Sequence, residues 1–169
     1  KKMGQNVGKD ADSRPRVLTT STPPAKSKKE EEKEVASKLL TARDTHSLDL
    51  QTCGLRTLPP PLFELTELMT LNLSTNLLKE LDDGITKLVS LSNLKLNGNK
   101  LTELPDLHHI PSLEVLDVGK NAFTMFPSNV CEVKTLVRFI AHCNRFTSLP
   151  SGTCVFLVTS LLPLNLFRI

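Results

Sequence analysis

Three nearly identical copies of a short motif constrain this chain more than any other feature. The pattern L-x-L-x-x-N, with Val in place of the second Leu in one copy, recurs at spacings of 23 and 22 residues. Its asparagines are Asn76, Asn99 and Asn121. Two more copies in the same register lie before and after these three, with Cys53 and Asn144 in the asparagine position. A fixed period of this length predicts a stack of repeated structural units.

The second half of each repeat indicates how the units stack. Most copies continue as x-L-x-x-L-P and then two further apolar positions, with Asp82 replacing the proline in the second copy. In such a stack each unit contributes one short strand, whose alternate side chains point into a shared core. The asparagine amide can donate to and accept from backbone groups that the turn would leave unpaired. We therefore expect an α/β fold, a solenoid with a parallel β-sheet.

Composition divides the chain into four parts. Residues 1–29 are polar and carry eight Lys or Arg against two Asp. They hold too few apolar side chains to offset the entropy of ordering, so a disordered basic tail is expected. Residues 30–44 show the spacing of an amphipathic helix, which we interpret as a cap on the first repeat, with a partner-binding helix as the alternative. About five repeats fill residues 45–152, and residues 153–169 form an atypical apolar C-terminus, either a degenerate repeat or a truncation.

The repeat form L-x-x-L-x-L-x-x-N-x-L-x-x-L-P-x-x-[IL]-x-x-L, over residues 48–150, resembles the intracellular Ras-group class of leucine-rich-repeat proteins. Residues 40–43 followed by residues 47–50 also resemble the helix that leads into the first strand in some cytoplasmic members. The resemblance implies a horseshoe with its parallel sheet on the concave face. It also implies a scaffold or adaptor that binds a protein partner, often in intracellular signalling.

Strand alternation predicts which side chains the concave face presents. They form a polar ladder with steps of about 5 Å between strands. Interaction hot spots favour Trp, Tyr and Arg, and the chain has no Trp or Tyr. Arg138 and Lys95 are then the best charged anchors for acidic groups on a partner. Val115 and Gly119 share the ladder. The expected protein-binding residues are Asp49, Gln51, Thr70, Asn72, Ser74, Asn93, Lys95, Asn97, Asp117, Arg138, Ile140 and His142.

The sequence does not predict an enzyme. The histidines are far apart in the repeat geometry, the pair His108 and His109 falls on the convex side, and none belongs to a recognisable nucleophile motif. Asp82 and Asp83 are typical of a solvated turn, and no glycine-rich phosphate loop is present. We expect no catalytic residue, no metal, no cofactor and no small-molecule substrate.

Location is predicted from absences and from one weak motif. The chain has no run of about 18 apolar residues, which a membrane span would need. Its four scattered cysteines favour a reduced, cytoplasmic compartment. Gly4 follows Met3 and is a candidate for lipidation, which would give weak membrane association through the tail. A plain flexible tail is the alternative. Because the tail has no aromatic side chain to stack on bases, we expect no nucleic-acid partner.

Two alternatives to the scaffold function are kept. In the first, the chain is the recognition fragment of a larger repeat-bearing enzyme or immune receptor. In the second, it is a lipid-anchored peripheral membrane protein.

Overall fold

The computed structural model of the protein describes residues 28–148. Gly4, most of the expected tail and the apolar C-terminus at residues 153–169 lie outside the described residues, so the predictions made for them remain predictions. Helix, strands and 3-10 helices follow one another in a regular order. Their bounds are α1 Lys28–Thr45, β1 Ser47–Asp49, η1 Pro60–Glu64, β2 Thr70–Asn72, η2 Asp83–Lys87, β3 Asn93–Lys95, η3 Leu107–His109, β4 Val115–Asp117, η4 Ser128–Glu132 and β5 Arg138–Ile140.

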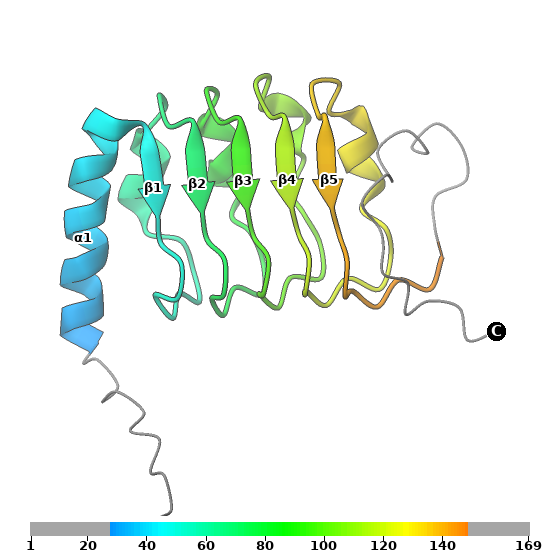
Figure 1. Cartoon of the computed structure of the whole chain (residues 1–169), viewed down its shortest axis with the longest axis horizontal. Coiled ribbons are helices and arrows are strands. Elements are labelled where there is room, and N and C mark those ends of the chain that lie inside the picture. Colours follow the sequence, from blue (N-terminus) through cyan, green and yellow to red (C-terminus); the bar gives the residue numbers. More distant parts are fainter. Residues whose placement is uncertain (1–27, 149–169) are drawn as a thin grey trace, which may run out of the picture.

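The five strands form one parallel sheet in chain order (Figure 1). Each strand has three residues, and only the middle one is fully buried. Strands that are neighbours in the sheet are also one repeat apart in sequence, so the register reproduces the sequence period. The aligned middle residues are Leu48, Leu71, Leu94, Leu116 and Phe139. The predicted solenoid with a parallel sheet is confirmed.

Behind the sheet, the 3-10 helices form the convex side (Figure 1). Each of them buries one apolar side chain in the common core: Leu62, Ile85, Leu107 and Val130. Three of these helices have five residues, whereas η3 has three. The repeat of 22 residues therefore loses its residue on the convex side, where a surface segment tolerates a deletion.

A column of asparagines joins each strand to the preceding repeat. The Nδ2 of Asn99 donates to the carbonyl oxygens of Leu73 and Leu96, both at 2.9 Å, and its Oδ1 accepts from the Leu78 amide at 3.1 Å. Asn76, Asn121 and Asn144 make the same three kinds of contact. Side chains that are largely buried thus satisfy backbone groups that would otherwise lack a partner.

Helix α1 covers the open side of the first repeat. Val35, Leu39 and Ala42 are buried in the same core as the leucines of the strands. The helix begins two residues before the expected residue 30 and ends one residue after 44. These differences are within the one or two residues by which assignments of helix ends commonly differ, and Lys28 and Lys29, good helix formers, extend the first turn. Within residues 28–148, no helix combines the length and apolarity that crossing a bilayer requires.

Candidate functional site

The outward face of the five-stranded sheet, which we call the sheet face, is the predicted concave surface. Strand register arranges its side chains in three columns, and all twelve predicted binding residues belong to them. The columns are Ser47, Thr70, Asn93, Val115 and Arg138; then Asp49, Asn72, Lys95, Asp117 and Ile140; and, just past the strand ends, Gln51, Ser74, Asn97, Gly119 and His142. Ser47, which is exposed, is the one member that sequence analysis missed, although alternation around Leu48 could have found it.

Several polar residues of the second column hold the turn that follows their own strand. The Oδ1 atoms of Asp49, Asn72 and Asp117 accept hydrogen bonds from the backbone amides two residues further on, at 2.9, 3.1 and 2.9 Å. Lys95 and Ile140 occupy the same column but have no acceptor atom to make this bond. Their side chains therefore stay available at the surface, Lys95 exposed and Ile140 half-buried.

Two positions of the third column are not exposed, contrary to expectation. Ser74 retains only 5% of its accessible surface, because its hydroxyl donates to the Oδ1 of Asn97. Gly119 is buried beneath the ring of His142, so close that a Cβ on Gly119 would lie 2.5 Å from the His142 Cε1. Ser74 therefore has little surface to offer a partner, whereas His142 is half-buried and covers Gly119.

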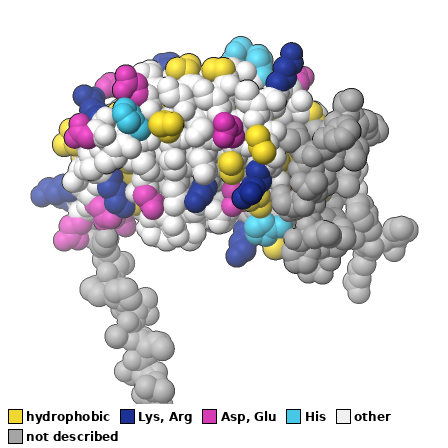
Figure 2. All heavy atoms as spheres, turned by 45° about the horizontal axis from the view of Figure 1, so that its top comes forward, with side chains coloured by type: hydrophobic (Ala, Val, Ile, Leu, Met, Phe, Trp, Pro, Cys, Tyr) yellow, Lys and Arg dark blue, Asp and Glu magenta, His cyan; other side chains and the backbone are white. Residues whose placement is uncertain are grey.

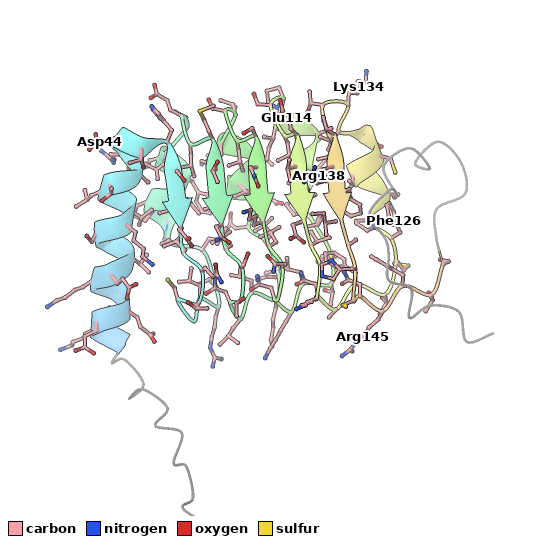
Figure 3. The ribbon with its side chains drawn as sticks, in the orientation of Figure 1. Asp44, Glu114, Phe126, Lys134, Arg138 and Arg145 are labelled. Carbon is pink, nitrogen blue, oxygen red and sulfur yellow. The ribbon has the colours of Figure 1, made fainter. Side chains whose placement is uncertain are left out.

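The side chains of the sheet face that are still available to a partner lie mainly over β3, β4 and β5. Arg138 is exposed on the sheet face at β5 (Figure 3) and is aligned with the apolar Val115. Lys95 is aligned with Asp117 on the next strand, so a residue of opposite charge stands beside it. The two anchors predicted together are therefore unequal, with Arg138 the less compensated positive charge.

Asn93, in the middle strand of this part of the sheet face, has an unusual side chain. Its Oδ1 is the only side-chain nitrogen or oxygen atom among residues 28–148 that is buried without a hydrogen-bond partner. Such atoms are rare in native structures and call for an explanation, functional use included. Asn93 thus belongs with Lys95, Arg138, Ile140 and His142 in the group of side chains that the fold does not fully use.

The free thiols and the acidic pair Asp82 and Asp83 give little support to other chemistry. Cys53 and Cys143 are free thiols. The location of the protein stays a prediction. Asp82 caps η2 by accepting from the Gly84 amide at 2.7 Å, so this member of the acidic pair has a structural use.

The repeats of this chain are similar to those of known proteins. Residues 43–101 and 66–123 match the family model of the leucine rich repeat. A leucine-rich-repeat protein of Leptospira interrogans superposes with a TM-score of 0.60 and 34% identity, over 61% of this chain and 26% of that one. YopM from Yersinia enterocolitica superposes with a TM-score of 0.58 and 30% identity, over 78% of this chain and 27% of that one.

The chain spans about a quarter of the length of these two structures. The functional domain of InlJ from Listeria monocytogenes is a third similar structure, with a TM-score of 0.54, 25% identity and coverage of 68% of this chain and 24% of that one. Among curated proteins, no sequence matches this chain significantly.

Proposed function

Since this chain is a leucine-rich-repeat protein, we propose that it is a non-catalytic scaffold whose sheet face binds a protein partner over β3, β4 and β5. Solenoids of this kind present extended surfaces for binding. The proposal includes the role in intracellular signalling and the cytoplasmic location that the Ras-group resemblance implies. That class assignment is itself part of the proposal.

The observation that carries the proposal is the unequal use of side chains along the sheet face. Asp49 near β1, Asn72 near β2 and Asp117 near β4 are occupied by the turns of their own repeats. Near β5, Arg138 is exposed, and Ile140 provides a half-buried apolar contact beside it. Arg is among the residue types that most often dominate binding energy at protein interfaces. A rigid sheet that holds an exposed Arg next to apolar surface suits a partner with a carboxylate flanked by apolar side chains.

A charge-reversal experiment tests this proposal. The variant Lys95→Glu/Arg138→Glu changes the sheet face, whereas Lys87→Glu/Lys134→Glu makes the same change in net charge away from it. Lys87 ends η2, and Lys134 extends from the rim of the molecule, away from the sheet (Figure 3). Both variants would first be compared with the wild type by circular dichroism and thermal unfolding.

Partners retained from cell extract by each protein would then be quantified by mass spectrometry, and the strongest would be titrated in purified form by calorimetry. We expect the affinity of the sheet-face variant for the partner to fall at least about tenfold, as it does when a hot-spot charge is removed. The affinity of the other variant should stay unchanged. Equal retention by both folded variants would contradict the proposed site.

A further inference from the structure

The convex side carries a group of side chains with no parallel elsewhere among residues 28–148. Asp106, His108 and His109 stand together at η3, and one possible ligand atom from each lies within 4.8 Å of the others. It is the only group of three or more His, Cys, Asp or Glu in this part of the chain with that property. All three residues are exposed. In Figure 2 a patch of histidine side chains stands on the upper rim, next to basic and acidic side chains.

Local contacts at η3 bring these three side chains together. Asp106 is the N-cap of η3, and its carboxylate accepts from the backbone amide of His108 at 3.4 Å and from the Nδ1 of the same residue. The rings of His108 and His109 lie with their centroids 3.8 Å apart and their planes tilted by 41°. Both imidazoles are therefore drawn to the side of the carboxylate, instead of spreading around the helix.

The hydrogen bond also prepares the donor atoms. It holds the Nδ1 of His108 and an oxygen of the Asp106 carboxylate directly opposite each other, as two ligands of one cation would have to be. A metal ion bound by both groups would take the place of the Nδ1 proton and be coordinated by Nδ1 of His108 and Oδ1 of Asp106.

We propose that Asp106, His108 and His109 form a site for a zinc-class divalent transition-metal ion. Two imidazoles and one carboxylate suit zinc, cobalt, nickel or copper, whereas calcium and magnesium prefer sets made only of oxygen ligands. Three protein ligands leave the fourth tetrahedral position to water or to a side chain of another molecule. This surface is separate from the sheet face, so the site does not depend on the proposed partner binding.

The neighbouring repeats set the charges around the site. The buried residues Ile85, Leu107 and Val130 occupy the same position in η2, η3 and η4. Counting from them, Lys87 and Glu132 flank His109 in the adjacent repeats. The positive charge on one side and the negative charge on the other cancel. The attraction for a cation therefore comes from the ligand set itself, with its single carboxylate.

Calorimetric titration tests the site on the whole 169-residue chain, freed of any purification tag and treated with a chelator. Zinc chloride would be titrated into the wild type and into the variants Asp106→Asn, His108→Ala and His109→Ala. We expect one zinc ion per wild-type chain. Each substitution should weaken binding at least about tenfold, since even changes outside the ligand shell typically cost 10- to 100-fold. Cobalt absorption spectra should show the loss of tetrahedral coordination in the same variants.

Two controls separate this site from other zinc donors. The variant His46→Ala/His142→Ala removes two imidazoles elsewhere, and Cys53→Ser/Cys143→Ser removes the free thiols; both should bind zinc as the wild type does. Because the three proposed ligands are exposed, their variants should melt like the wild type in the presence of chelator. Absence of saturable binding at one ion per chain would overturn the site. So would retained affinity in His108→Ala, or loss of binding in the cysteine variant.

Discussion

The turn that follows each strand, which we call the turn side, and the convex side of each repeat differ in how closely their sequences must be kept. On the turn side, four of the five repeats use the same asparagine with the same three hydrogen bonds. On the convex side, one repeat replaces proline with Asp82, and another shortens its 3-10 helix to three residues. A buried turn needs an amide that both donates and accepts, whereas a convex segment needs only one buried apolar side chain. New surface chemistry, such as the Asp106 cluster, can therefore appear on the convex side.

The largest expected effect comes from the asparagine column. Asn99→Ala would leave two carbonyl oxygens and one amide without their partner, so we expect a loss of about 4 kcal/mol in the free energy of unfolding. Asn129 in η4 is a matched control on the convex side, where its half-buried Nδ2 donates to two carbonyl oxygens. Asn129→Ala should cost about 1 kcal/mol. Urea denaturation measures both, and equal losses would remove the distinction between the two sides.

Truncating a core side chain should destabilise the protein by nearly the same amount in the sheet and on the convex side. Leu94 in β3 and Leu107 in η3 are both almost fully buried. Leu94→Ala and Leu107→Ala should each lower the free energy of unfolding by about 3 kcal/mol. The same urea series gives the comparison. If Leu107→Ala cost under about 1 kcal/mol, the convex segments would not belong to the common core, and their tolerance would have another cause.

A smaller effect is expected at the contact between Gly119 and His142. Gly119→Ala would force the new Cβ against the imidazole ring, at a cost of about 1 kcal/mol. In the double variant Gly119→Ala/His142→Ala the ring is gone, so most of that cost should disappear. A double-mutant cycle measured by thermal unfolding tests this coupling. Additive effects would mean that the two residues do not press on each other.

The smallest effect concerns the residue before the asparagine position. Its φ is positive in all five repeats, yet only the third repeat has a glycine there: Thr52, Thr75, Gly98, Lys120 and Cys143. Because a β-branched residue is strained in this region, Thr75→Gly should stabilise the protein by about 0.5 kcal/mol, despite the larger entropy of the unfolded glycine. Differential scanning calorimetry should show a slightly raised Tm. A lowered Tm would show that Thr75 is unstrained.

Sequence analysis predicted the fold almost completely, because the period and the asparagine position are each repeated several times. The register of the leucines and the position of the predicted residues on the sheet face both follow from that repetition. What it missed depends on contacts between neighbouring side chains. The burial of Ser74 follows from a hydrogen bond to Asn97, and that of Gly119 from the His142 ring. The Asp106 cluster was missed because His108 and His109 were considered without the N-cap beside them.

Site-specific photo-crosslinking tests the central claim, that the sheet face holds the partner. A photoreactive amino acid would replace Lys95 on the sheet face in one protein and Lys87 on the convex side in another, both exposed lysines of the same fold. The account predicts that the partner is captured from position 95 and not from position 87. Capture from position 87 alone, or equally from both positions, would contradict it.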